Sequence, residues 1–171
     1  MQVLLITAVL ATVILCGASY EFGPLCCSNP INRVRGRDRH GSGAFGSSRG
    51  SKTHKGLDIE CPDGSKVYAP MDMTITRQSR PYGTNSAIDN GIAFTANDLP
   101  GVSFKLWYMH PVKTSGTVRK GEQIGTMLPM QSVYPGITSH VHLEKGDETD
   151  PQSIIGTQNA QANRLFCSHR D

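Results

Sequence analysis

Short runs of strand-forming residues, separated by turn residues, dominate the chain between residues 56 and 144. Pro-Asp-Gly, Asn-Gly and Lys-Gly-Glu sequences lie between these runs and bound them with turn chemistry. The apolar spacing of an amphipathic helix longer than a turn or two is not evident. Strands are expected at residues 57–59, 66–69, 92–94 and 104–109, with a hairpin-like turn at residues 120–122. This pattern predicts an all-β domain with an antiparallel β-sheet core and long loops.

Composition agrees with one domain of this kind. The chain has 171 residues, of which 37% are hydrophobic, and this is enough for a single core. Its 18 Gly and 10 Pro favour strands and turns over a helix bundle. The formal net charge is only +3, which gives little support to nucleic-acid binding, so we expect no nucleic-acid partner.

The N-terminus has the composition of a secretory signal. The first 20 residues carry no charged side chain, and residues 3–15 (VLLITAVLATVIL) would form a helix of about 20 Å, which is too short to span a bilayer. The small residues 16–19 that follow fit a cleavage site. The alternative is a buried N-terminal strand or helix. We expect a secreted, extracellular protein with no membrane insertion, because no later segment approaches membrane length.

Export determines how the cysteines are interpreted. Cys16 leaves with the signal peptide, and four cysteines remain. In an oxidising compartment an even number of cysteines predicts disulfides. Because Cys26 and Cys27 are adjacent, we expect each to pair with one of Cys61 and Cys167. Zinc ligation by these cysteines is the weaker alternative, since no C-x-x-C spacing is present.

The chain divides into four parts: a signal peptide (1–19), a basic arm rich in Gly and Ser (20–55), a β domain (56–151) and a polar tail (152–171). Between residues 21 and 55 there are seven basic residues and two acidic ones. The arm is either a basic patch for an anionic surface such as a glycan or cell wall, or a solvated flexible segment. We expect the tail to be loosely attached apart from its cysteine.

Two short motifs carry metal-ligand chemistry. His54 and Asp58 lie four residues apart at the entry to an expected strand. His140 and His142 are spaced i and i+2, so a strand places both on one face. A catalytic zinc site takes three ligands from His and Asp or Glu and leaves one position for water. Each motif is weak alone, but together they favour a metal site if their strands are neighbours.

The segments HKGLD, VYAP, WYMH, KGEQIGT and SHVHLE resemble the lysostaphin-type (β-lytic) zinc metallopeptidases. The resemblance covers nearly the whole mature chain and implies an antiparallel β-sheet core with the metal in a groove. It also implies that His54, Asp58 and His142 bind Zn²⁺ and that His140 acts as base toward the water. Trp107 is expected as core or groove wall rather than as a catalyst.

The segments DRHG, VYAP, AIDNG and VYPGI more closely resemble the chemotaxin branch of this family. This resemblance implies a Cys26–Cys61 disulfide. Active peptidases carry a catalytic His at the position of His110, whereas the vertebrate chemotaxins carry Lys there. His110 is therefore expected to hydrogen-bond the water or the developing oxyanion. Glu144 either orients a ligand imidazole or is a solvent-exposed strand carboxylate. Tyr108, like Trp107, is expected to form part of the core or of the groove wall.

Two functions follow from these resemblances. The first is a secreted zinc metalloendopeptidase that hydrolyses Gly-rich peptides or the peptide crosslinks of the bacterial cell wall. The second is a non-catalytic extracellular signalling or immune protein that binds zinc and a cell-surface receptor or glycan. The His at position 110 favours the enzyme, and the closer chemotaxin resemblance favours the signalling protein.

Overall fold

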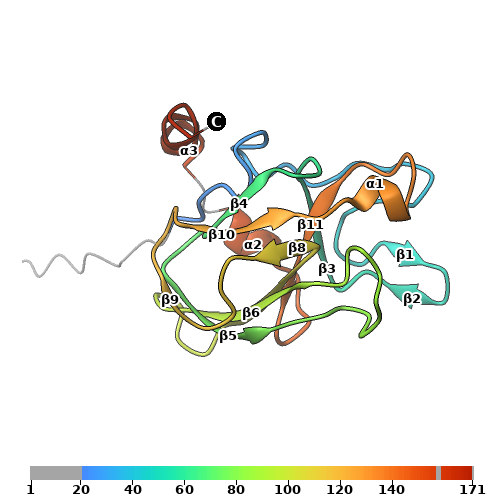
Figure 1. The fold of residues 1–171 in the computed structure, drawn as a ribbon, viewed down its shortest axis with the longest axis horizontal. Coiled ribbons are helices and arrows are strands. Elements are labelled where there is room, and N and C mark those ends of the chain that lie inside the picture. The colour runs from blue at the N-terminus through green and yellow to red at the C-terminus, as the bar shows by residue number, and fades with distance from the viewer. Residues whose placement is uncertain (1–20, 157–158, 171) are drawn as a thin grey trace, which may run out of the picture.

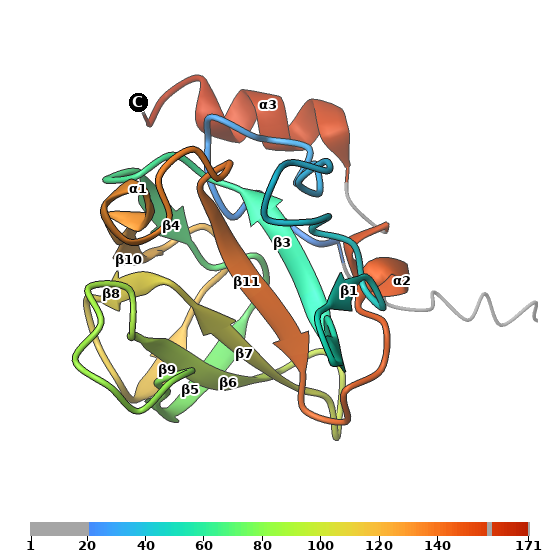
Figure 2. The ribbon, with the colours of Figure 1, turned by 90° about the vertical axis from the view of Figure 1, so that its right-hand side faces the viewer.

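Six strands form one antiparallel sheet, in the order β3-β11-β7-β6-β5-β9 (Figure 1). The computed structural model describes residues 21–156 and 159–170. The predicted signal peptide, residues 1–19, therefore lies outside the described residues. The strands are β3 (Gly56–Glu60), β5 (Met73–Gln78), β6 (Gly91–Ala96), β7 (Ser103–Trp107), β9 (Gly116–Val118) and β11 (His140–Lys145). Figure 2 shows β3, β11, β7 and β6 side by side.

The smaller elements surround this sheet. A second sheet has the order β4-β10-β8, and β1 pairs with β2 in a short hairpin. Their bounds are β1 (Ser48–Arg49), β2 (Lys52–Thr53), β4 (Lys66–Tyr68), β8 (Met109–Pro111) and β10 (Gln123–Met127). The helices are α1 (Met130–Val133), α2 (Gln152–Ile155) and α3 (Ala160–Cys167). Every pairing between these strands is antiparallel, which confirms the predicted all-β class.

In the part of the chain that the structure describes, none of the helices combines the length and the apolar composition that a membrane crossing requires.

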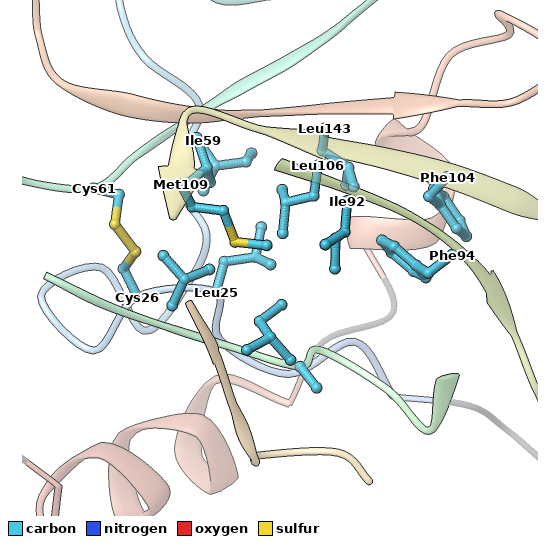
Figure 3. Packing of buried hydrophobic residues seen from close by; sticks show 14 of the residues in the cluster. Leu25, Cys26, Ile59, Cys61, Ile92, Phe94, Phe104, Leu106, Met109 and Leu143 are labelled. Carbon is cyan, nitrogen blue, oxygen red and sulfur yellow. A yellow bond between two sulfur atoms is a disulfide. The ribbon is translucent and has the colours of Figure 1, made fainter. Parts of the chain in front are cut away.

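The inner face of the large sheet packs against the second sheet. Side chains alternate along each strand, so Val141 and Leu143 of β11 are fully buried in the core. They join Leu106 of β7 and Met109 of β8 in a single apolar cluster, which Figure 3 shows with the Cys26–Cys61 disulfide at its edge. The same alternation directs His140, His142 and Glu144 of β11 to the opposite, outer face. That outer face carries the functional motifs.

Two local predictions need correction. Residues 104–109 were expected as one strand, but Tyr108 has φ +73° and separates β7 from β8. Residues 118–125 were expected as a hairpin, but β9 pairs with β5 while β10 pairs with β4 and β8. The turn at Gly121, with φ +82°, therefore links the two sheets rather than two partners of one sheet.

The N-terminal segment and the tail pack onto the body of the protein. Phe22 and Leu25 are fully buried, and Val34 forms a β-bridge with Ile59 of β3. The expectation of a loosely attached tail is wrong. Its helix α3 lies beside the N-terminal segment (Figures 1 and 2), and the Asn163 side-chain amide donates hydrogen bonds to backbone carbonyls of that segment.

The disulfides join the same segments. Cys26 pairs with Cys61 across a Cα–Cα distance of 5.7 Å, and Cys27 pairs with Cys167 across 5.1 Å. Both pairs confirm the predicted connectivity. The second bridge spans 140 residues of sequence and fastens α3 to the N-terminal segment.

We expect the double variant Cys27→Ser/Cys167→Ser to fold but to lose about 2–4 kcal/mol of unfolding free energy. The reason is that the bridge restricts a long loop in the unfolded chain. Urea unfolding followed by tryptophan fluorescence measures the loss. An unchanged free energy of unfolding, or a Cys26–Cys27 bond in a non-reducing peptide map, would contradict this assignment.

Candidate metal centre

The pairing of β3 with β11 brings the two metal-ligand motifs together. In the antiparallel register Asp58 lies opposite His142, and His140 lies opposite Glu60. His54 immediately follows the β1–β2 hairpin, and its backbone N–H and carbonyl bond to the loop that precedes β1. The structure thus confirms that the two segments are neighbours, and it places His140 and His142 on one face of β11.

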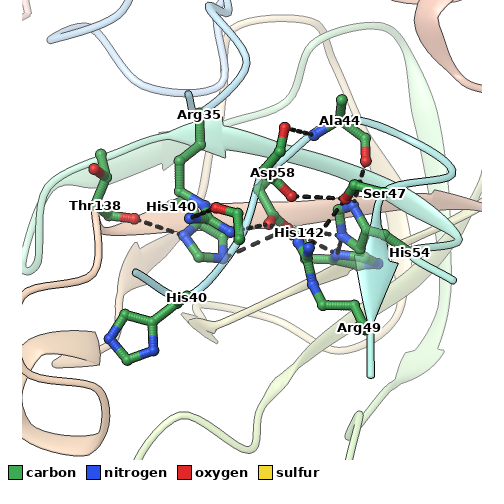
Figure 4. A network of polar contacts seen from close by, with 12 residues as sticks. Arg35, His40, Ala44, Ser47, Arg49, His54, Asp58, Thr138, His140 and His142 are labelled. Atoms are coloured by element: carbon green, nitrogen blue, oxygen red, sulfur yellow. Dashed lines mark hydrogen bonds and ion pairs between the residues drawn. The ribbon is translucent and has the colours of Figure 1, made fainter. Parts of the chain in front are cut away.

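Three side-chain atoms converge at the centre of this face (Figure 4). His54 Nε2 lies 3.0 Å from Asp58 Oδ1 and 3.0 Å from His142 Nδ1, while His142 Nδ1 lies 3.1 Å from Asp58 Oδ1. A tetrahedral zinc ion with bonds of about 2.0–2.1 Å holds its ligand atoms about 3.3 Å apart. All three residues are buried, and all three line the groove described below.

The protons of His54 indicate that this cluster suits a cation. His54 Nδ1 lies 2.9 Å from the backbone carbonyl oxygen of Ala44, which only accepts, so Nδ1 carries a proton. The Nε2 atom of the neutral imidazole then presents a lone pair toward the Asp58 carboxylate, which is also an acceptor. Two buried acceptors 3.0 Å apart are stabilised by a positive ion between them. Two imidazoles and one carboxylate are the donor set that Zn²⁺ takes in proteins.

The second oxygen of Asp58 is held by two arginines. Arg35 Nη2 lies 3.1 Å from Oδ2 and Arg49 Nη2 lies 3.0 Å from it. Burial by itself raises the pKa of Asp58, but the adjacent imidazoles of His142 and His54 outweigh it and hold that pKa well below its usual range. Asp58 is therefore an ionised carboxylate with a fixed orientation, and only Oδ1 faces the imidazoles.

His140 has the tautomer that a base requires. Its Nδ1 lies 2.7 Å from the backbone carbonyl oxygen of Thr138 and donates to it, which leaves the lone pair on Nε2. That Nε2 atom lies 3.5 Å from Asp58 Oδ1, beside the candidate metal ligands. Burial lowers the pKa of His140, which favours the neutral ring at neutral pH.

Glu144 lies behind His142 on the same face. It is buried, so the alternative of a solvent-exposed carboxylate is wrong. Glu144 Oε2 lies 3.5 Å from His142 Nε2, which is long for a hydrogen bond, and Lys105 Nζ lies 2.7 Å from Glu144 Oε1. Glu144 thus lies on the far side of the ring, the position from which carboxylates commonly orient metal-ligating histidines, while His142 Nε2 itself is buried without a hydrogen-bond partner among the described residues.

Aromatic rings form the walls of a groove of about 1010 Å³ around these residues. The Trp107 indole stacks on the His142 ring, with centroids 5.1 Å apart and planes 12° apart. Its Nε1 donates to Ser79 Oγ at 2.9 Å, which fixes the indole. The Tyr108 ring meets His140 edge-on at 5.6 Å. The prediction that these two aromatics form core or groove wall is confirmed.

The structure does not bring His110 to the groove. His110 lies in the middle of β8, where its backbone pairs with Thr126 of β10. Its neighbours Met109 and Pro111 are buried, whereas His110 is exposed. It is not among the described residues that line the groove. Tyr108, two residues earlier, faces the groove instead.

Sequence reasoning missed three residues of the site. Arg35 and Arg49 were counted only as part of a basic arm, and Tyr82 was not singled out. None of the three carries a local signal, because each reaches the site through contacts with residues distant in the chain. Runs of basic residues beside a metal-ligand motif are the only feature that hinted at Arg35 and Arg49.

Comparison with known proteins agrees with this geometry. Residues 52–153 match the family model described as Peptidase family M23. The chain belongs to peptidase family M23. The match confirms the resemblance to lysostaphin-type metallopeptidases and spans both ligand motifs of the site. Arg35 and Arg49 lie before the matched residues.

Two animal proteins are similar to this chain over most of its length. The chain is 40% identical over 145 residues to leukocyte cell-derived chemotaxin-2 of Bos taurus, covering 85% of this chain and 94% of the relative. It is 44% identical over 134 residues to myeloid protein 1 of Gallus gallus, covering 77% of this chain and 40% of that protein. The predicted chemotaxin resemblance is thus confirmed.

The fold is also found in a solved bacterial structure. Csd3 of Helicobacter pylori superimposes with a TM-score of 0.53 at 14% identity, over 89% of this chain and 40% of that chain. At this identity the likeness concerns the fold alone, and it agrees with the antiparallel architecture described above.

Gly56 permits the close approach of His142 to β3. A Cβ atom there would lie 2.6 Å from His142 Nε2 and would also strike the backbone carbonyl of Leu143. We expect Gly56→Ala to displace the imidazole and weaken Zn²⁺ binding by about 10–100-fold, measured by competition with a chelating dye. Gly36→Ala is the matched control, because nothing lies within 4 Å of its Cβ. Equal zinc affinity in the two variants would contradict this role.

Proposed function

We propose that the protein is a secreted zinc metalloendopeptidase that hydrolyses Gly-rich peptides or peptidoglycan crosslinks. The supporting observation is the ligand cluster of His54, Asp58 and His142 with His140 beside it. Structural zinc sites use four protein ligands, whereas catalytic sites use three and keep one position open. An open groove of about 1010 Å³ next to these residues gives room for an extended peptide.

The roles of the side chains follow from their geometry. A bound Zn²⁺ supplies an acidic water and polarises the scissile carbonyl. His140 Nε2 accepts a proton from the attacking water, whose oxygen adds to the carbonyl carbon. His140 then returns this proton to the departing amide nitrogen as the C–N bond breaks, which gives an amine and a carboxylic acid that releases its remaining proton to solvent. Thr138 holds His140 in the required tautomer, and Glu144 lies behind the His142 ring.

Secretion is part of this proposal. Two disulfides are typical of proteins in oxidising compartments, and the N-terminal sequence has the pattern of a secretory signal. An extracellular location gives such an enzyme access to bacterial cell walls or to peptides outside the cell.

A non-catalytic extracellular signalling or immune protein is the second candidate. It is favoured by the 40% identity to a chemotaxin over nearly its entire length. It is also favoured by the position of His110 on β8, outside the groove lining. In this function the zinc ion stabilises the site, and the groove binds a cell-surface receptor or a glycan.

Elemental analysis of the purified protein is expected to find about one zinc per chain. His142→Ala is expected to lose it, because only two of the three ligands remain. His110→Ala is the control that should keep its zinc, since this residue lies on β8. Full zinc stoichiometry in His142→Ala would refute the ligand assignment.

Incubation with pentaglycine and with purified peptidoglycan, with and without a chelator, separates the two functions. The enzyme is expected to cleave at least one of these substrates in a chelator-sensitive manner. His140→Ala should retain zinc but lower turnover about 10²–10⁴-fold, because the general base is lost. If the zinc-loaded wild type cleaves neither substrate, the endopeptidase proposal fails and the signalling function is favoured.

A further inference from the structure

One end of the groove is built from tyrosines that the mechanism above does not use. Tyr82 and Tyr108 line the groove near His140, and their hydroxyl oxygens lie 2.8 Å apart. Their rings are nearly parallel, with centroids 6.2 Å apart. Tyr82 is 44% exposed, so this pair is open to an incoming ligand.

Tyr108 faces the groove because its backbone is unusual. In a regular strand consecutive side chains point to opposite faces, so Trp107 and Tyr108 would not both line one groove. The φ of +73° at Tyr108 breaks this alternation. A left-handed conformation is a genuine outlier for a bulky residue, and such residues cluster at functional sites.

The surrounding backbone holds this conformation in place. Tyr108 N–H donates to the Asn90 carbonyl at 2.8 Å, and the Tyr108 carbonyl accepts from Leu128 N–H at 2.9 Å. Tyr82 is fixed as well, since its N–H donates to the buried Asp89 carboxylate at 2.8 Å. Both phenols are therefore presented from rigid backbone, which is the requirement for a preorganised donor.

The pair lies directly beside the reacting groups. The Tyr108 ring meets His140 edge-on at 5.6 Å and His142 at 6.2 Å, so the phenol adjoins both the candidate base and a candidate ligand. The pair has two O–H protons and uses one of them in the hydrogen bond between the hydroxyls. Tyr134, which also lines the groove, contacts Tyr82 as well, so the three hydroxyls share two hydrogen bonds and one O–H donor remains for an acceptor bound in the groove.

We propose that the Tyr82–Tyr108 hydroxyl pair binds the carbonyl oxygen of a peptide in this groove and stabilises the negative charge that develops there. As water adds to the carbonyl carbon, the electron pair of the C=O bond moves onto the oxygen, which accepts the hydrogen bond. The electron pair returns to the C=O bond when the C–N bond breaks, and the phenol keeps its proton throughout. This inference rests on the proposed peptidase function, and it transfers to the tyrosines the donor role that the sequence assigned to His110.

The test uses two probes on the zinc-loaded protein. One is pentaglycine, and the other is an oligoglycine analogue in which a phosphinic group replaces the scissile amide. The phosphinic oxygens resemble the tetrahedral transition state, so they depend more on an oxyanion donor than the flat amide does. Calorimetry gives both affinities for wild type, Tyr82→Phe, Tyr108→Phe and His110→Ala. Tyr68→Phe is the matched control, since it removes a phenol oxygen from a strand of the second sheet.

We expect Tyr108→Phe and Tyr82→Phe to bind the phosphinic analogue at least about tenfold more weakly. Pentaglycine affinity should change by less than about threefold and zinc content should stay unchanged. Where hydrolysis is observed, kcat should fall about 10²–10³-fold, as for loss of one oxyanion donor, with little change in KM. Tyr68→Phe should match wild type in both affinities.

The binding readout separates this inference from the proposed function. If wild type binds the analogue in a manner that depends on the tyrosines but cleaves nothing, the peptidase proposal fails while the carbonyl-binding role stands. Three results would overturn the inference: no binding of the analogue by zinc-loaded wild type, unchanged analogue affinity in both groove variants, or a loss in His110→Ala alone.

Discussion

The antiparallel pairing of β3 with β11 is the interaction on which the rest of the site depends. Its register sets Asp58 opposite His142, although the two residues are 84 positions apart in the chain. Because side chains alternate along a strand, a slip of one residue in either strand would turn the ligand of that strand toward the apolar core. Leu57 and Leu143 are paired in the same ladder and are buried on the core side, so burial of these residues fixes the register that assembles the ligands.

This arrangement places an ionised carboxylate in a buried position, which is costly unless the charge is paired. Arg35 and Arg49 supply the pairing at Asp58 Oδ2, and both come from the segment before the region matched by the family model. The N-terminal segment is therefore part of the site rather than a flexible arm. Its attachment through Cys26 and Cys27 keeps this segment in place.

The groove has two chemically different ends. The His140 end is formed by tyrosine phenols, whereas the Glu144 end carries Lys105 and the exposed ion pair of Lys55 with Glu148. A peptide lying across the site would therefore meet phenols at one end and Lys105 with the Lys55–Glu148 pair at the other, with Arg49 and Lys52 also in the lining. This asymmetry is compatible with catalysis and also with binding of a signalling partner, and the hydrolysis experiment distinguishes the two.

The sequence alone determined the antiparallel all-β class, because strand and turn patterns are local. Its short motifs carried the family resemblance, which implied His54, Asp58 and His142 as a candidate ligand set and Cys26–Cys61 as a disulfide. The sequence did not predict β5 or α3, because their stability comes from packing rather than from strong local preference. Only the tertiary structure placed Arg35 on Asp58 and turned Tyr108 into the groove while leaving His110 on an exposed strand position. Those outcomes depend on contacts between distant segments and on one left-handed residue, neither of which a linear pattern encodes.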